Sequence, residues 1–222
     1  MSDLPSLKQS ILRSVTGLVL FALITAGAVS LTRLLTAERI EENRQLAAAR
    51  LLHELAPPDQ YRMNLQQPLL LPPVAALGHT RPVALQVAFQ NGQPAMVLLP
   101  VVAPDGYTGR IELLVALRLD GQVQGVRVIE HRETPGLGDK IEAAKSDWIF
   151  SFNGRSLNNP DIAGWTVRRD GGEFDQFTGA TITPRAVVHA VRRSLEWLQD
   201  DTELLALLNE YAAALPVEEP TP

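Results

Sequence analysis

The chain has 222 residues, of which 45% are hydrophobic, and a formal net charge of −5. This length holds one sizeable globular domain with an appendage, and the negative charge argues against a nucleic-acid partner, because nucleic-acid binders normally present a basic surface. The absence of cysteine excludes disulfides, iron–sulfur ligation by this chain and a cysteine nucleophile. The four histidines show no metal-ligand spacing, so we expect no metal site.

The first feature along the chain is an almost uncharged run from Ser14 to Thr32, preceded by the N-terminal segment 1–13. Its length is close to the roughly 20 residues that cross a bilayer core, which predicts a transmembrane anchor at 14–32. Two alternatives stay open. One is a buried soluble helix, and the other is a cleaved signal peptide, for which Ala26–Ala28 has the small-residue pattern of a cleavage site. Basic residues on both sides leave the membrane orientation undecided.

The following segments predict a helix and then a sheet. Residues 33–58 are rich in Ala, Leu, Glu and Arg and end in two prolines, which predicts a stalk helix, whereas the proline-rich section to Arg81 is expected to be irregular. Strand-like segments follow at residues 83–89, 95–102, 110–119 and 123–131. The turn dipeptides Asn91-Gly92, Asp105-Gly106 and Asp120-Gly121 separate them. The pattern predicts an antiparallel meander, with Tyr107 packed at its middle turn.

A loop rich in proline and glycine follows the fourth strand. Residues 133–138 contain Pro135, Gly136 and Gly138, which interrupt a strand, so the loop is expected at the end of the sheet. Its tight backbone and its one apolar side chain, Leu137, suit a flat ring but also suit a plain turn. Residues 139–146 then predict a short helix, and Trp165 and Trp197 are expected in the core.

A second segment delivers a threonine hydroxyl to the start of a helix. Gly179 has no Cβ and Ala180 almost no side chain, so a bulky group could come close to the backbone beside Thr181. Thr183 is expected to be the N-cap and Pro184 the first residue of a helix that runs to about residue 198.

The start of this helix suits an anion. Its free N–H groups and the positive end of its dipole favour a phosphate near Thr181. Arg185, in the first turn, opposes the dipole unless an anion lies nearby. An ordinary capped helix with a solvent-facing arginine remains the alternative.

Two motifs in these segments resemble a known family. Asp175 to Thr181, Asp-Gln-Phe-Thr-Gly-Ala-Thr, resembles the flavinylation motif of FMN-binding domains, in which the last threonine carries FMN through a phosphoester bond. His131 to Gly138 resembles the His-x-Glu-Thr-Pro-Gly-Leu-Gly signature of membrane-anchored FMN subunits in the Rnf complex and the sodium-pumping NADH:quinone reductase. Residues 139–141, 145–149 and 170–177 are similar to the G subunit of the Rnf (Rsx) complex in particular.

The resemblance implies an α+β protein with an N-terminal transmembrane helix. One FMN-binding domain follows at 59–200, with an antiparallel sheet flanked by helices. The resemblance ends near residue 198, and the composition of residues 201–222 predicts a C-terminal helix and, from residue 216, a tail. The resemblance also implies FMN esterified to Thr181 and no catalytic residue in the chain itself. The implied cofactor-binding residues are Thr178, Gly179, Ala180 and Asp175 in the attachment segment, and Glu133, Thr134, Leu137 and Gly138 against the ring.

The function implied is electron transport within an ion-translocating oxidoreductase, a translocase of the bacterial inner membrane, with the FMN domain in the periplasm. The implied partners are other membrane subunits of the complex and a flavin transferase that attaches FMN. Three alternatives remain: the equivalent subunit of a sodium-pumping NADH:quinone reductase, an FMN enzyme acting alone, and a flavin-holding sensory or binding module. The sequence favours an electron carrier because it shows no general acid–base constellation and no G-x-G-x-x-G fingerprint.

Overall fold

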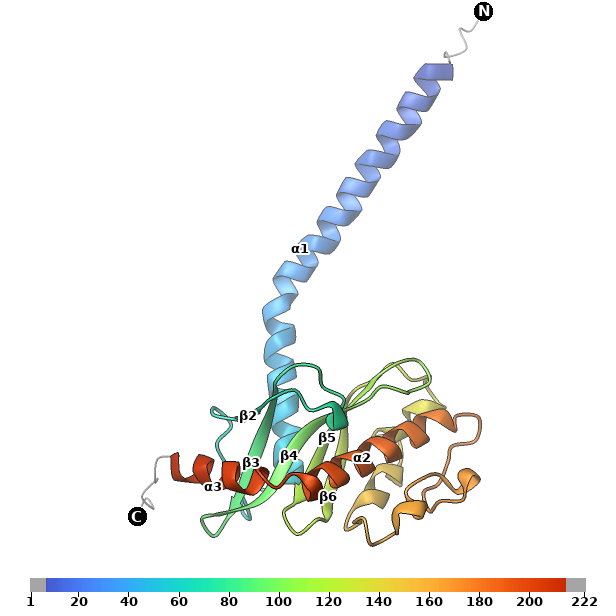
Figure 1. The fold of residues 1–222 in the computed structure, drawn as a ribbon. Helices are drawn as coiled ribbons and strands as arrows, with labels where there is room; N and C mark the ends of the chain where they lie inside the picture. Colours follow the sequence, from blue (N-terminus) through green and yellow to red (C-terminus); the bar gives the residue numbers. More distant parts are fainter. Residues whose placement is uncertain (1–6, 215–222) are drawn as a thin grey trace, which may run out of the picture. The chain divides into compact units, whose positions relative to one another are not determined.

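The computed structural model describes residues 7–214, and the chain divides after Ala48 into two compact units. Helix α1 (Leu7–Leu55) forms all of the first unit that is described and continues a short way into the second (Figure 1). The predicted anchor and stalk are therefore one uninterrupted helix. The expected tail at 216–222 lies outside the described residues, as do residues 1–6 of the N-terminal segment 1–13.

The apolar part of α1 is longer than the sequence predicts. Residues Ile11–Ile40 form the one helical stretch, within the described range, that is long and apolar enough to cross a membrane, and its most apolar window buries nothing. At about 1.5 Å per residue this stretch extends about 45 Å, against about 30 Å for a bilayer hydrocarbon core. It therefore exceeds the minimum needed to span a membrane.

Threonines within this apolar helix satisfy their hydroxyl groups locally. Thr16, Thr25, Thr32 and Thr36 each donate a hydrogen bond of 2.8–2.9 Å to the carbonyl four residues earlier. A hydroxyl bonded in this way needs no water as a partner. The threonine side chains of the stretch are therefore compatible with an apolar surrounding.

The second unit is built on the predicted antiparallel meander. Its long strands follow one another in chain order as β3 (Val83–Gln90), β4 (Gln93–Ala103), β5 (Ile111–Arg118) and β6 (Val123–Glu130). The β3–β4 turn places Asn91 and Gly92 at φ 53° and 79°, the positive values that tight hairpins of this kind require. Two short strands, β1 (Arg62–Met63) and β2 (Leu69–Leu71), also pair with β3, in the section expected to be irregular.

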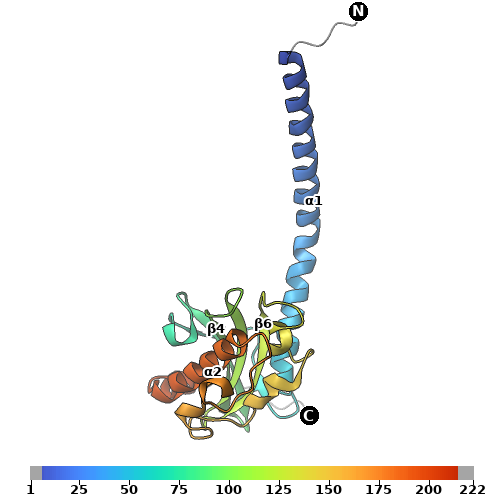
Figure 2. The same ribbon diagram turned by 90° about the vertical axis from the view of Figure 1, so that its right-hand side faces the viewer.

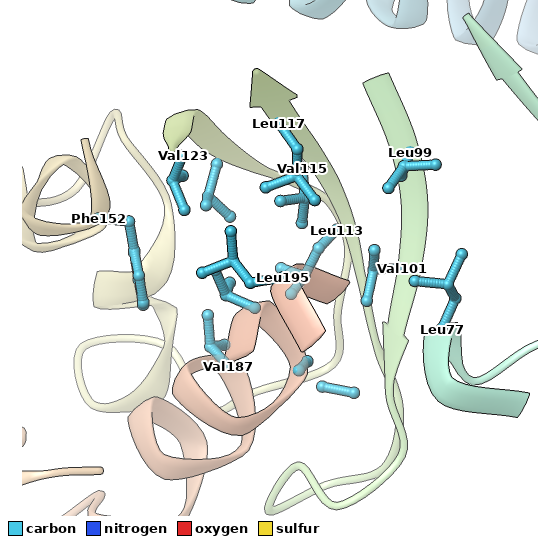
Figure 3. Packing of buried hydrophobic residues seen from close by; sticks show 14 of the residues in the cluster. Leu77, Leu99, Val101, Leu113, Val115, Leu117, Val123, Phe152, Val187 and Leu195 are labelled. Carbon is cyan, nitrogen blue, oxygen red and sulfur yellow. The ribbon is translucent and has the colours of Figure 1, made fainter. Parts of the chain in front are cut away.

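One face of the sheet is covered by α2 (Ile182–Asp200) (Figures 1 and 2). Its side chains Val187 and Leu195 lie among Val115 and Leu117 of the sheet, with Phe152 beside them (Figure 3). The predicted helix face is confirmed: Val188, Val191 and Leu195 are buried, and Leu198 is partly buried against the same core. Trp165 is fully buried, and Trp197 packs on this core as expected.

The last residues of α1 pack on the opposite face of the sheet (Figure 2). Leu55 is buried there among the outer-face residues of β4 and β5, and a Cβ on Gly125 would lie 2.6 Å from its Cδ2 atom. Glu54 accepts hydrogen bonds of 2.8 and 2.6 Å from the buried guanidinium of Arg127. Residues Ala49–Leu55 therefore belong to the folded domain.

The chain between β6 and α2 contains only short 3₁₀ segments among long loops. These are η2 (Gly138–Ile141), η3 (Asp147–Phe152), η4 (Ile162–Gly164) and η5 (Arg168–Asp170). The helix predicted at 139–146 is thus limited to η2, because the backbone of Glu142 is already extended, with ψ 133°. A further segment, η1 (Ala75–Leu77), lies between β2 and β3, and α3 (Leu204–Ala214) confirms the predicted C-terminal helix.

Candidate functional site

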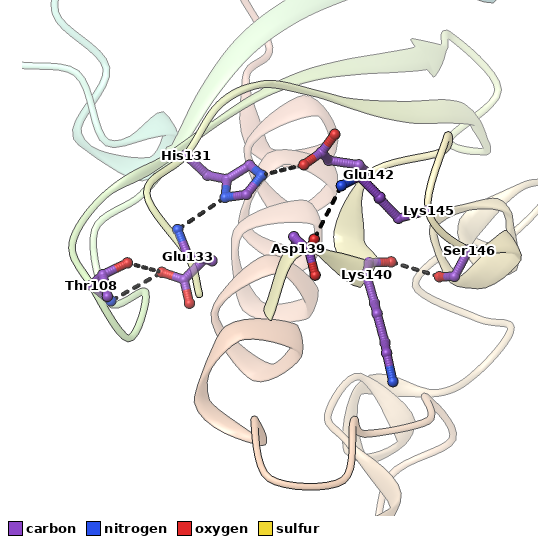
Figure 4. Close-up of polar contacts among 8 residues, drawn as sticks. All are labelled: Thr108, His131, Glu133, Asp139, Lys140, Glu142, Lys145 and Ser146. Carbon is purple, nitrogen blue, oxygen red and sulfur yellow. Dashed lines mark hydrogen bonds and ion pairs between the residues drawn. The ribbon is translucent and has the colours of Figure 1, made fainter. Parts of the chain in front are cut away.

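One buried carboxylate, that of Glu133, joins three separate segments. Its Oε1 atom accepts hydrogen bonds from the backbone N–H and the hydroxyl of Thr108, at 3.0 and 3.1 Å (Figure 4). Its Oε2 atom accepts a hydrogen bond from the hydroxyl of Thr183. Glu133 is only 4% exposed, and a buried carboxylate requires such partners. It thereby ties the β4–β5 turn and the loop after β6 to the first turn of α2.

His131 orients this glutamate. The backbone N–H of Glu133 donates to Nδ1 of His131 at 3.0 Å, and Nε2 of the same ring lies 2.9 Å from Oε1 of Glu142 (Figure 4). Because Nδ1 accepts a hydrogen bond, it carries no proton, so the neutral ring holds its proton on Nε2 and donates it to Glu142. The first residue of the motif therefore fixes the backbone that presents Glu133.

The end of the loop is held by close packing and charge. A Cβ at Gly138 would lie 2.9 Å from Cβ of Glu133 and 3.0 Å from Oγ1 of Thr183, so only glycine fits. Asp139, which follows, is buried and lies 3.3 Å from Nζ of Lys145. The backbone N–H of Gly136 holds the pKa of Asp139 below its ordinary value, with Lys145 acting in the same direction against the effect of burial.

The second motif lies beside this loop. Gly179 has a φ of 81°, a conformation that favours glycine, and a Cβ there would lie 3.6 Å from Cδ2 of Leu137. Leu137 itself is 43% exposed, although the backbone around it is fixed. Thr134, Thr178 and Gly179 are exposed as well, and Ala180 is half-buried. The two motifs together therefore place the exposed side chain of Leu137 beside the exposed backbone of Gly179.

Thr181 occupies the position before the first helical residue of α2, Ile182, and its side chain makes no capping hydrogen bond. The prediction that Thr183 is the N-cap was wrong, because the Thr183 hydroxyl is buried on Glu133 and the helix starts two residues earlier than expected. Pro184 fits inside the first turn, where the missing N–H has no partner to lose. This arrangement leaves the hydroxyl of Thr181 available for chemistry.

The charged residues near Thr181 are paired with one another. Arg185 donates to both oxygens of Asp170, at 2.6 and 3.0 Å, and Arg168 lies 2.7 Å from Asp175. Arg185 therefore does not face solvent alone, as the alternative from the sequence had it, and Asp170 already supplies the anion that the sequence prediction assigned to a phosphate. The sequence did not predict the pairing of Asp170 with Arg185. Asp170 lies in the acidic stretch 170–175, fifteen residues before Arg185, and this spacing alone does not indicate a contact.

A cavity of about 480 Å³ lies against the first half of the second motif, residues 175–181. Its lining includes Trp148, Arg168, Phe174, Asp175 and Phe177. The indole Nε1–H of Trp148 donates to the carbonyl of Asp175 at 2.7 Å, which fixes the first residue of the motif. The aspartate side chain remains 63% exposed and can be reached from solvent.

The strands β5 and β6, the two linked loops and most of α2 lie in a region that matches the FMN-binding domain. The family model described as FMN-binding domain matches residues 106–196, and the model of the RnfG N-terminal region matches residues 1–55. The chain belongs to the family of the G subunits of ion-translocating oxidoreductase complexes.

The relatives match nearly end to end. The G subunit of the ion-translocating oxidoreductase complex of Pseudomonas aeruginosa is 46% identical over 208 residues, covering 92% of this chain and 96% of its own. The proteins of the same name from Shewanella loihica and Vibrio cholerae are 42% and 43% identical, covering 90% and 85% of this chain and 94% and 90% of their own.

The residues present fit FMN. The exposed side chain of Leu137 offers an apolar surface to a flat ring, and Gly179 leaves the backbone beside it uncovered. The hydroxyl of Thr181 stands at a helix N-terminus, where backbone N–H groups and the dipole favour a phosphate.

Proposed function

We propose that the protein is a membrane-anchored flavoprotein that carries electrons through FMN esterified to Thr181, within an ion-translocating oxidoreductase complex. One observation carries the proposal: the Thr181 hydroxyl makes no capping hydrogen bond, whereas the neighbouring Thr183 hydroxyl is bound to Glu133. Of the two threonines at the helix start, only Thr181 is therefore free to form an ester. FMN, when attached, supplies reversible redox chemistry.

The residues of the two motifs hold and surround the cofactor. Leu137 provides an apolar contact for the ring, and Thr134 a polar one. Glu133 acts by position, because Thr108 and Thr183 already occupy its carboxylate oxygens. Gly138 allows the loop to approach Glu133 and the start of α2 closely.

The stretch Ile11–Ile40 anchors the protein in the bacterial inner membrane, and the FMN domain lies in the periplasm. A covalent tether suits that location because it prevents loss of the cofactor outside the cytosolic FMN pool. Attachment requires a flavin transferase, to which Asp175 and Thr178, both exposed, are accessible. Other membrane subunits of the complex are the electron-transfer partners, since the relatives are named as subunits of such a complex.

The test compares Thr181→Val with Thr178→Ser, each co-expressed with a flavin transferase. Valine keeps the branched shape of threonine without the hydroxyl, so fold damage is small while the ester becomes impossible. The denatured proteins are examined for in-gel flavin fluorescence and for the mass of the modified peptide. We expect no covalent flavin on Thr181→Val and normal flavin on Thr178→Ser.

Three results would contradict the proposal in different ways. Covalent flavin on Thr181→Val would show that Thr181 is not the attachment site. Flavin found on residue 178 would move the ester by three positions. A parent protein without flavin under the same conditions would remove the main support for an electron carrier.

A further inference from the structure

Tyr107 lies at the tip of the β4–β5 turn and is 66% exposed. The sequence predicts this tyrosine to be packed at the turn, and that prediction was wrong. The turn is closed without it: the hydroxyl and N–H of Thr108 bind Glu133, and the space beside Gly106 is filled by Ile111 and Glu133. The tyrosine ring is therefore left outside the core.

Its exposure does not come from a loose loop. A Cβ on Gly106 would lie 2.2 Å from the carbonyl oxygen of Gly109, so the turn is closed tightly on itself. The residue after Tyr107 makes two hydrogen bonds to a buried carboxylate. The backbone on both sides of Tyr107 is thus fixed, and the exposed aromatic ring is held at a defined place.

That place is next to the proposed flavin site. Tyr107 adjoins Thr108, which binds Oε1 of Glu133, and Thr181 is two residues from Thr183, which binds Oε2 of the same carboxylate. Leu137 adjoins Gly138, whose Cβ position is within 3.0 Å of Glu133 and Thr183. Tyr107, Leu137 and Thr181 are therefore each one or two residues away from a single buried group.

We propose that Tyr107 contacts the isoalloxazine ring of the FMN attached to Thr181, as an aromatic partner beside the aliphatic contact of Leu137. A tyrosine offers a large apolar face with a polar tip, and aromatic rings pack favourably in offset or edge-to-face arrangements. Contact with a tethered ring would cover the apolar surface that this residue exposes. The inference rests on the proposed attachment at Thr181.

The experiment uses the full-length protein in detergent, co-expressed with a flavin transferase. Tyr107→Ala and Tyr107→Phe are compared with the parent at equal flavin loading, determined by peptide mass. A tyrosine in contact with excited flavin quenches its emission by electron donation, and phenylalanine is a much poorer donor. Tyr211→Phe is the matched control, because Tyr211 on α3 packs against Phe89 on β3, away from both motifs.

We expect flavin fluorescence to rise severalfold in both Tyr107 variants and to stay at the parent level in Tyr211→Phe. Denaturation should abolish the differences. Quenching by added iodide should increase in Tyr107→Ala, which uncovers the ring, but not in Tyr107→Phe, which keeps it covered. If the alanine variant loads poorly, the phenylalanine variant, which preserves the shape, decides the matter by its fluorescence.

Unchanged fluorescence and iodide access in loaded Tyr107 variants would overturn this inference and leave the proposed attachment intact. Tyr107 would then belong to a surface for a partner protein. A parent chain without flavin on Thr181 would instead overturn the proposed function.

Discussion

Glu133 and Thr183, fifty residues apart in the chain, are joined by a buried hydrogen bond between the carboxylate and the hydroxyl. The bond makes the loop after β6 and the first turn of α2 one structural element. Because Thr181 and Leu137 are attached to the two sides of this element, their separation is set by the fold. With FMN esterified to Thr181, as proposed, Leu137 would lie on the neighbouring side of the same element.

Replacing Glu133 with alanine should destabilise the domain by about 1–3 kcal/mol, because the buried hydroxyl of Thr183 and the partly buried donors of Thr108 lose their acceptor. Denaturant unfolding of the protein without flavin measures the change. Glu112→Ala, which removes a pair with the exposed Arg110, should cost less than about 1 kcal/mol and serves as the control.

A double-mutant cycle isolates the bond itself. Thr183→Val and Glu133→Ala should be less than additive, with a coupling of about 0.5–3 kcal/mol. Additive effects would mean that the two side chains do not depend on each other in solution, and the loop and the helix would then be fixed by other contacts.

Asp139 should make the free energy of unfolding of the domain depend on pH in the acid range. Its pKa is lowered in the folded state by the Gly136 N–H and by Lys145, so its contribution is present above the unfolded-state pKa, near 3.8, and is lost as the pH falls through the folded-state value. Asp139→Asn should therefore be less stable at neutral pH and lose less stability in the acid range. Thermal unfolding from pH 7 to pH 3 measures both effects, with the exposed Asp59→Asn as control. Parallel profiles for Asp139→Asn and the parent would contradict this assignment.

Features set by local sequence could be predicted. The turn dipeptides gave the strand order of the meander, and the spacing of Val188, Val191 and Leu195 gave the buried face of α2. Pro135 and the two glycines placed the first motif in a loop at the end of the sheet, and the second motif was expected directly before a helix, which is where the structure has both. Each of these features depends on residues within one turn or one strand of each other.

Features set by distant pairs could not be predicted. Local preference favours a threonine before a proline as an N-cap, but Thr183 binds Glu133 instead, so the helix begins at Ile182. Tyr107 was expected to pack at its turn, but the turn is closed by Gly106 and Glu133. Spacing along the chain carries no information on such contacts, because the partners meet only when the sheet and α2 have packed.

The last prediction concerns Leu137, whose 43% exposed side chain lies beside Gly179. Leu137→Ala should leave covalent attachment intact, because the hydroxyl of Thr181 is untouched. It should shift the flavin absorption spectrum and midpoint potential, because the ring loses an apolar contact and gains water. Redox titration of the fully loaded protein measures the shift. Leu70→Ala, which trims an exposed leucine on β2, is the matched control and should change neither quantity. A potential equal to that of the parent in fully flavinylated Leu137→Ala would remove Leu137 from the site. The proposed ester at Thr181 would not be affected by that result.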